Sequence, residues 1–302
     1  MRIFAPLLRV VGARLQSLLR GSTLLANPFL SAKFIPLERR DVFDQMRIVV
    51  GGSISGLSAG GDGLPVPPVD LREGWGGMPA TYLNTGRRDM ERMLTAIDQA
   101  GEPVPDIRRV LDFGCATGRL LRFYPQSPDT ECWGVDIKAK SILWCQEHLS
   151  PPFRFATTTT LPHLPFEDGY FDLVYCASVF THIADLPDAT LLELRRILRP
   201  GGLIYATVHD EHSVDLLFRN FQERELTRQL RRIDAETGVL RGEYKFFYIG
   251  GEPWTQVFYD NSYLVQKWSQ FMDVVSVIPE AMDYQTALLL RKRSDRSASG
   301  TI

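Results

Sequence analysis

The chain has 302 residues, of which 44% are hydrophobic and 23% are charged, as in ordinary globular proteins. Its net charge of −2 is uneven, because residues 1–37 carry five basic side chains and no acid, whereas residues 38–290 carry a net charge of −10. An acidic central region without a basic stripe disfavours nucleic acid as a partner. No apolar run approaches the ~20 residues that span a bilayer, and the four cysteines show no metal-ligand spacing. Cysteines in or beside predicted core strands indicate a reducing compartment, so we expect a cytoplasmic protein.

The composition divides the chain into four regions. Residues 1–50 form a basic amphipathic extension, in which apolar side chains recur at helical spacing between arginines. This extension packs on the core or on a second protomer, makes peripheral contact with a membrane through residues 1–25, or is a disordered or targeting segment. A Gly/Ser/Pro-rich linker at 51–68 precedes the main domain at 69–293, and 294–302 forms a disordered tail. The oligomeric state stays open.

Residues 110–118, Val-Leu-Asp-Phe-Gly-Cys-Ala-Thr-Gly, are the most informative stretch. A buried strand ends near Asp112, and Gly114 and Gly118 bracket a tight turn before an apolar helix over residues 120–124. A strand, a glycine turn and a helix N-terminus together suit a nucleotide-like ligand. The spacing is not the G-x-G-x-x-G of dinucleotide-binding proteins, and Asp112 would repel a pyrophosphate. An acid at this place therefore favours a ligand with a cationic end.

Strands and helices then alternate, as in a parallel sheet. The strand predicted at 132–135 is followed by Asp136. An acid at the end of this strand, about 20 residues after a glycine loop, can accept hydrogen bonds from ribose hydroxyls. Asp136 also suits a helix N-cap. The predicted elements are a strand at 132–135, a helix at 138–149, a buried strand at 171–180, a helix at 188–198 that stops at Pro200-Gly201-Gly202, and a strand at 202–208.

The C-terminal part begins with a charged helix predicted at 219–233. Residues 244–260 are rich in aromatic side chains, which form either the wall of an acceptor site or part of the core. A helix at 263–271 and strands at 274–278 and 285–291 complete the chain.

In order and spacing, the motifs of residues 105–210 resemble the class I S-adenosylmethionine-dependent methyltransferases, of the bacterial small-molecule or glycan type. The resemblance implies an α/β fold with a doubly wound, Rossmann-like, seven-stranded and mostly parallel sheet whose last strand is antiparallel. It implies S-adenosyl-L-methionine as cofactor and a small-molecule or glycan acceptor, with methylation on oxygen expected. The alternatives are a catalytically inactive S-adenosylmethionine-binding interaction protein and a nicotinamide-dependent oxidoreductase, which the glycine spacing disfavours.

The resemblance also assigns residues to the cofactor. Asp112 would orient its amino-acid portion and Asp136 its ribose, and Thr158 would replace the acid or amide that often reads the adenine amine. Tyr82 and Arg87 would line the methionine end, unless they belong only to a docking helix. The candidate cofactor-binding residues are Tyr82, Arg87, Asp112, Gly114, Cys115, Gly118, Asp136, Ile137, Thr158 and Ser178.

A hydroxyl acceptor benefits from a base, and histidine is the usual base near neutral pH. His182 and His209 follow predicted strands, so both would lie at the carboxyl edge of the sheet, where α/β sites lie. They are the catalytic candidates, with His182 the better placed. The alternative for His182 is that it caps the following loop.

Overall fold

The computed structural model describes residues 60–75, 77–99, 107–241, 243–250 and 255–294. The predicted extension at 1–50, including the proposed membrane contact, and the tail beyond residue 294 lie outside these ranges. Residues 60–68 of the predicted linker contact the domain, since the Arg122 guanidinium binds the Asp62 carboxylate (Nε–Oδ2, 2.6 Å) and the carbonyl oxygens of Leu64 and Pro65. No helix in the described ranges is long and apolar enough to cross a membrane.

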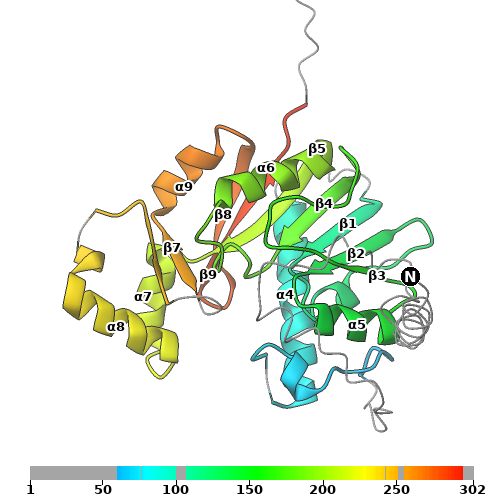
Figure 1. Ribbon diagram of the computed structural model, residues 1–302, viewed down its shortest axis with the longest axis horizontal. Helices are drawn as coiled ribbons and strands as arrows, with labels where there is room; N and C mark the ends of the chain where they lie inside the picture. Colours follow the sequence, from blue (N-terminus) through cyan, green and yellow to red (C-terminus); the bar gives the residue numbers. More distant parts are fainter. Residues whose placement is uncertain (1–59, 76, 100–106, 242, 251–254, 295–302) are drawn as a thin grey trace, which may run out of the picture.

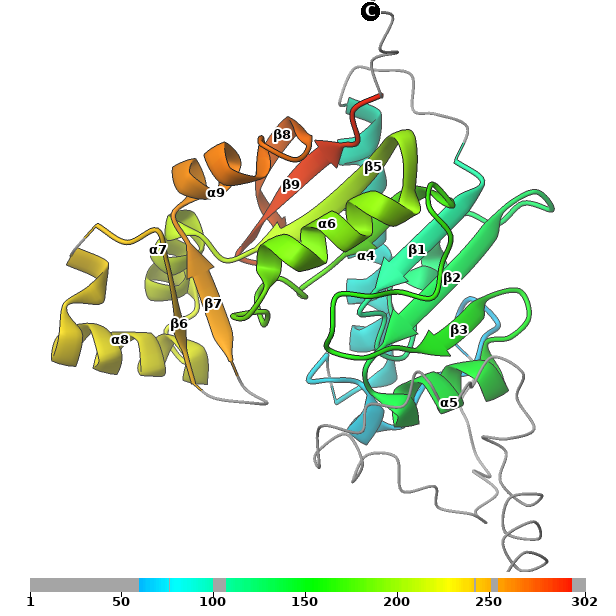
Figure 2. The same cartoon turned by 45° about the horizontal axis from the view of Figure 1, so that its top comes forward.

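A seven-stranded sheet organises the molecule (Figures 1 and 2). Its strand order is β3-β2-β1-β4-β5-β9-β8, and β9 runs antiparallel to both of its neighbours while the first five strands are parallel. This confirms the predicted α/β architecture with an antiparallel last strand. The strands are β1 (Arg109–Phe113), β2 (Glu131–Asp136), β3 (Arg154–Thr157), β4 (Phe171–Cys176), β5 (Leu198–Val208), β8 (Asp273–Met282) and β9 (Gln285–Arg291).

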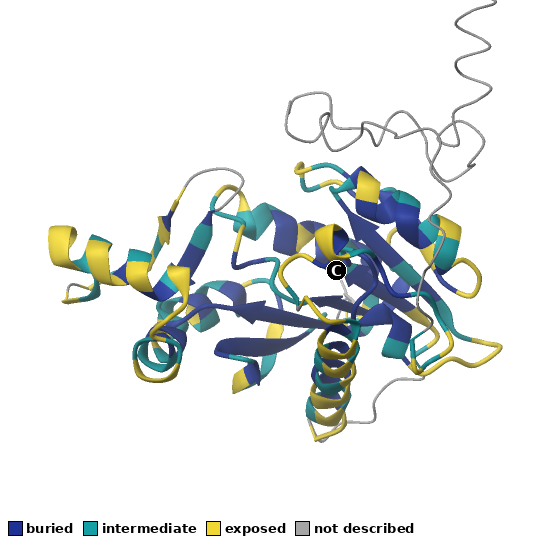
Figure 3. Cartoon of the chain, turned by 90° about the horizontal axis from the view of Figure 1, so that it is seen from below, coloured by how far each residue is buried: buried dark blue, intermediate teal, exposed yellow. Residues whose placement is uncertain are grey.

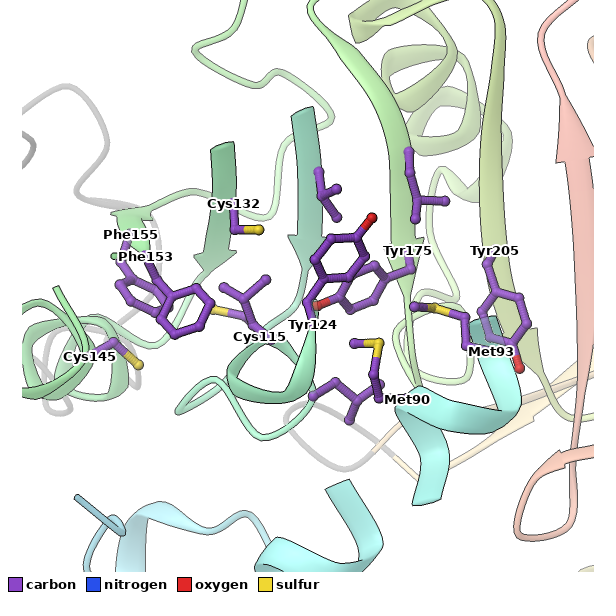
Figure 4. Close-up of a cluster of buried hydrophobic side chains, with 14 of the residues drawn as sticks. Met90, Met93, Cys115, Tyr124, Cys132, Cys145, Phe153, Phe155, Tyr175 and Tyr205 are labelled. Atoms are coloured by element: carbon purple, nitrogen blue, oxygen red, sulfur yellow. The ribbon is translucent and has the colours of Figure 1, made fainter. Parts of the chain in front are cut away.

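Helices cover both faces of the sheet. Successive side chains of a strand point to opposite faces, and the central strands carry apolar side chains on both, so both faces need cover. Val110 of β1 packs toward α4 (Pro79–Gln99) and α5 (Ala139–His148). The next residue, Leu111, packs toward α6 (Pro187–Ile197) and α9 (Asn261–Trp268). Figure 4 shows part of the first cluster, with methionines of α4 beside tyrosines of β4 and β5, and Figure 3 shows the buried strands between more exposed helices.

The helix predicted over residues 120–124 is wrong. Only one 3-10 turn, η3 (Leu121–Phe123), follows the glycine loop, and Tyr124 is already extended with ψ 133°. Pro125 is the reason, since a residue that precedes proline is disfavoured in the helical region.

Two predicted strand boundaries also differ from the structure. β4 ends at Cys176 rather than at residue 180, because Ser178 has a φ of 61° and turns the chain away. β5 begins at Leu198 and continues through the predicted helix stop. At this stop, the Gly201 amide donates to the Lys292 carbonyl, and the Lys292 amide donates to the Gly202 carbonyl. The two glycines therefore extend the strand instead of ending it.

The helix predicted at 219–233 is two helices, α7 (Glu211–Asn220) and α8 (Glu225–Thr237). Asp210 and Ser213 form a capping box that starts α7 early. Phe221 leaves the helix with φ −125° and ψ 40°, and its ring packs edge-on against Tyr284 at 5.4 Å. This ring contact, which sequence periodicity does not reveal, accompanies the break and leaves Phe221 partly buried.

An insertion separates β5 from α9 and projects from the sheet (Figure 1). It contains α7, α8, η4 (Val239–Arg241), β6 (Phe246–Ile249) and β7 (Gln256–Tyr259). Near-parallel rings join it to the sheet: Phe247 lies 5.1 Å from Phe258, Phe258 lies 4.9 Å from His209, and His209 lies 5.4 Å from Tyr284. Much of the aromatic segment is therefore core, although Phe246 and Tyr248 are exposed.

This aromatic stack predicts how His209 responds to substitution. The imidazole is buried, both nitrogens lack hydrogen-bond partners within the described chain, and burial lowers its pKa to about 3. His209→Phe keeps the ring and should leave the free energy of unfolding in urea unchanged or higher. His209→Ala should lower it by about 2–4 kcal/mol through loss of ring packing. Equal losses in both variants would contradict a packing role.

Candidate active site

The glycine loop after β1 is held by the carboxylate at the end of β2. Asp136 accepts hydrogen bonds from the amides of Ala116 (Oδ2, 2.8 Å) and Lys138 (Oδ1, 2.8 Å). Ala116 has a φ of 46°, which is a backbone conformation that residues other than glycine rarely adopt. The hydrogen bond to Asp136 is made in this conformation. Asp136 thus fixes the loop, and each of its oxygens keeps a lone pair for another donor.

Gly114 cannot be replaced without strain. Its φ is 84°, and a Cβ at this position would lie 2.4 Å from Cγ2 of Val179, in the turn that follows β4. Gly118 has a φ of 70°, and a Cβ there would lie 3.0 Å from Leu149 of the α5 end. The first glycine permits the loop to meet the turn after β4, and the second permits packing against the α5 side.

A cavity opens beside this loop. Asp112 is buried at its edge, and burial raises the pKa of this carboxyl to about 8. A cation bound next to Asp112 would stabilise the ionised form. The residues that line the cavity are Arg72, Trp75, Tyr82, Asp112, Gly114, Cys115, Ala116, Thr117, Arg119, Leu120 and Ala177.

The segment before α4, including η2 (Val69–Leu71), lies against the loop. The Thr117 hydroxyl donates to the carbonyl of Leu71 (3.0 Å), and the Tyr82 hydroxyl lies 3.1 Å from the same hydroxyl. On the α5 side, Lys138 pairs with Glu73 and Lys140 pairs with Asp70 (2.8 Å). These contacts place residues 69–75 over the cavity edge.

Of the predicted cofactor residues, four line the cavity: Tyr82, Asp112, Gly114 and Cys115. Arg87 does not; it is exposed on α4, and its guanidinium lies 4.7 Å from the centre of the Phe123 ring. The other predicted residues are likewise outside the lining: Gly118, Asp136, Ile137, Thr158 and Ser178.

A second group of predicted residues gathers where β2 and β3 end. Ile137 follows Asp136 and is half-buried, and the amide of Thr158 donates to the carbonyl of Asp136 (3.0 Å). The Thr158 hydroxyl is buried and finds no hydrogen-bond partner within the described chain. A buried hydroxyl of this kind is expected to meet a ligand or water.

The third group, Ser178 and His182, follows β4. Ser178 donates its amide to Thr207 (2.6 Å) and accepts from the Gln285 side chain (2.9 Å). His182 is exposed, and its Nδ1 lies 2.8 Å from the carbonyl oxygen of Thr255. Since a carbonyl only accepts, Nδ1 carries the proton and Nε2 holds the free lone pair. Protein packed around the ring lowers the pKa of His182, which favours the neutral base.

Seven lining residues were not among the predicted cofactor residues. Four of them have polar or aromatic side chains, Arg72, Trp75, Thr117 and Arg119, and the other three are Ala116, Leu120 and Ala177. Arg119 directly follows Gly118, so its place beside the motif was a usable signal. Its guanidinium forms a buried ion pair with Asp89 (2.7 Å) and lies 3.7 Å from the centre of the Trp75 ring. For Arg72 and Trp75 the sequence shows no periodicity or motif.

The residues present fit S-adenosylmethionine. Asp112 can face the ammonium of its amino-acid portion, and Asp136 retains acceptor capacity for two ribose hydroxyls. The unpartnered Thr158 hydroxyl belongs to the residue whose amide donates to the Asp136 carbonyl, and it offers a further polar group for the same ligand.

Comparisons with known proteins agree with this geometry. The family model described as a methyltransferase domain matches residues 111–206. The malonyl-[acyl-carrier protein] O-methyltransferase of Geobacter sulfurreducens is 34% identical over 125 residues, covering 40% of this chain and 45% of that protein. The demethylmenaquinone methyltransferase of Thermus thermophilus is 36% identical over 118 residues, covering 38% of this chain and 52% of that protein. The chain thus spans about half the length of these relatives.

A solved structure extends the likeness in fold. It is a complex of the Trm112 methyltransferase activator with a methyltransferase of Haloferax volcanii; the matched chain is 17% identical with a TM-score of 0.50, covering 76% of this chain and 98% of that chain. The family match thus shows that residues 111–206 belong to a methyltransferase domain, and the strand order and this likeness show the Rossmann-like fold of the class I S-adenosylmethionine-dependent methyltransferases.

Proposed function

We propose that the protein transfers a methyl group from S-adenosylmethionine to an oxygen of a small-molecule or glycan acceptor. The observation that carries this proposal is a pair of buried carboxylates at the ends of adjacent parallel strands: Asp112 lines the cavity, and Asp136 binds the amide of the lining residue Ala116. The O-methyltransferase named above, which shares the matched region, supports the choice of oxygen. The acceptor side would lie toward the turn after β4 and the insertion.

When bound, S-adenosylmethionine would supply a methyl group on a sulfonium sulfur. The acceptor lone pair would bond to the methyl carbon while the carbon–sulfur bond breaks, and the sulfur would leave as a neutral sulfide. The chain then has mainly to align the reactants, and alignment alone contributes about 7–11 kcal/mol in favourable cases. Asp112 would hold the amino-acid portion of the cofactor and Asp136 its ribose, and Arg72 and Trp75 would form part of the cavity wall.

His182 is the base in this proposal. It is exposed, and Thr255 fixes its tautomer so that Nε2 can take the proton that an acceptor hydroxyl loses. His209 is not assigned this role, because its ring is buried between Phe258 and Tyr284.

A second candidate function is binding of the cofactor without catalysis. Two features favour it: Ala116 stands where the family motif usually has its middle glycine, and Thr158 stands where an acid or amide is frequent. Binding of S-adenosylhomocysteine without methyl transfer to any of a panel of hydroxyl-bearing small molecules and glycans would support this alternative.

Cofactor binding provides the first test. Isothermal titration with S-adenosylhomocysteine should give measurable heat, and Asp136→Ala should weaken binding roughly 10- to 100-fold, since bonds to a charged group contribute about 1.5–3 kcal/mol. Asp129→Ala, which changes an exposed acid just before β2, serves as the control and should bind like the wild type. Absence of heat with the wild type would refute the proposed function.

The pH dependence of binding tests Asp112. With a pKa of about 8 in the free protein, Asp112 is mostly protonated at pH 6, and binding of an ammonium beside it requires loss of that proton. Affinity for S-adenosylhomocysteine should therefore rise with pH up to about 8, by at most roughly tenfold per unit. Asp112→Asn should flatten this part of the profile; an unchanged slope in the variant would assign the titration to another group.

Methyl transfer tests His182. With radiolabelled S-adenosylmethionine and an accepted hydroxyl compound, His182→Asn should lower kcat roughly 100- to 10,000-fold while cofactor affinity stays unchanged. The wild-type rate should fall as pH drops below the lowered pKa of His182, because protonation removes the base. His163→Asn, at an exposed position, is the control. A variant with wild-type kcat and pH profile would leave His182 with the capping role.

A further inference from the structure

The turn after β4, which carries His182, has a strained backbone. Ser178 in this turn has a φ of 61°, and residues other than glycine keep such a conformation only where surrounding contacts hold them in it. Further along the same turn, the His182 amide donates to the Val179 carbonyl (2.9 Å). The contacts that hold Ser178 therefore also set the position of the His182 backbone.

A closed hydrogen-bond circuit holds Ser178. Its amide donates to the Thr207 hydroxyl (2.6 Å), this hydroxyl donates to Oε1 of Gln285 (2.6 Å), and Nε2 of Gln285 donates back to the Ser178 hydroxyl (2.9 Å). Thr207 and Gln285 are buried, near the end of β5 and at the start of β9. Loss of either side chain would leave buried polar atoms of the other members without a partner.

The circuit also connects to β7 of the insertion. The Ser178 hydroxyl lies 3.3 Å from the buried Thr181 hydroxyl, and the Thr181 carbonyl accepts from the Val257 amide (2.8 Å). Two residues before Val257, the Thr255 carbonyl lies 2.8 Å from Nδ1 of His182. One histidine is therefore held twice, with its backbone in the turn and its ring on the Thr255 carbonyl.

Resting on the proposed methyl transfer with His182 as base, we propose that Thr207 and Gln285 are positioning residues for His182. Through Ser178 they keep the turn in the conformation in which Nδ1 donates to Thr255, so that Nε2 carries the free lone pair. Without the circuit, the turn relaxes from its positive φ and the bond to Thr255 is lost. The imidazole then becomes a mixture of its two tautomers, and only one of them offers Nε2 as a base.

NMR of the ring nitrogens, in protein labelled with nitrogen-15 histidine, measures this tautomer without cofactor or acceptor. At pH 8 the lowered pKa of His182 leaves its ring neutral, and the wild type should carry the proton on Nδ1 alone. The signal is assigned by its loss in His182→Asn. Thr207→Val removes the hydroxyl at nearly constant volume, and Gln285→Met removes the amide from the other side of the circuit. Both variants should show a mixture of tautomers, whereas Thr207→Ser, which keeps the hydroxyl, should show the wild-type one.

Thr286→Val is the matched control. Thr286 lies next to Gln285 on β9, is as buried as Thr207, and has a hydroxyl without a hydrogen-bond partner within the described chain. It should keep the wild-type tautomer. A wild-type tautomer in Thr207→Val or in Gln285→Met would overturn the inference, and so would an equal change in Thr286→Val. If Thr207→Val does not fold, Gln285→Met decides alone.

Methyl transfer gives a second measurement. With radiolabelled S-adenosylmethionine and an accepted hydroxyl compound, Thr207→Val should lower kcat roughly 10- to 100-fold, with affinity for S-adenosylhomocysteine changed by less than about threefold. In the His182→Asn background the same substitution should lower kcat by less than about twofold, because it acts through His182. A full further loss in that background would overturn the inference. Absence of cofactor binding or methyl transfer in the wild type would instead overturn the proposed function, and the NMR result would still decide whether the circuit sets the tautomer.

Discussion

The hydrogen bond from the Ala116 amide to the Asp136 carboxylate is the contact on which the site depends. It holds a residue with positive φ in the loop after β1 and joins that loop to the end of β2. The carboxylate is buried, and burial raises its pKa, so the loop amides offset part of the cost of keeping a charge there. A single side chain therefore shapes the loop and presents acceptor atoms to a ligand.

The same loop organises its surroundings through Thr117. Its hydroxyl meets both the Leu71 carbonyl and the Tyr82 hydroxyl, so the segment before the sheet, α4 and the loop share one hydrogen-bonded node. Polar networks of this kind tend to act together, because loss of one member leaves the others unsatisfied in a buried place. The cavity is thus closed by parts of the chain that lie more than 40 residues apart in sequence.

Local patterns in the sequence predicted those strands and turns that depend on residues close together in the chain. A buried run followed by an acid predicted where β1 and β2 end, and Asp112 and Gly114 of the glycine motif do line the cavity. The predictions failed where packing between residues far apart in the sequence sets the structure. Phe221 splits a continuous charged pattern where its ring packs against Tyr284. Arg72 carries no pattern, because its place at the cavity follows from docking of a segment onto a distant loop.

The insertion begins and ends at a single place. Asp210 and Glu211 start α7, and Asn261, which starts α9, donates its amide to Glu211 (3.0 Å) and its side chain to Asp210 (3.4 Å). A module that leaves and rejoins a scaffold through neighbouring residues can be exchanged during evolution without rethreading the sheet. The family match stops at residue 206, just before this junction. Divergence in this lineage is therefore expected by replacement of a whole module, with β7 constrained to keep its amide bonds to Thr181 and His209.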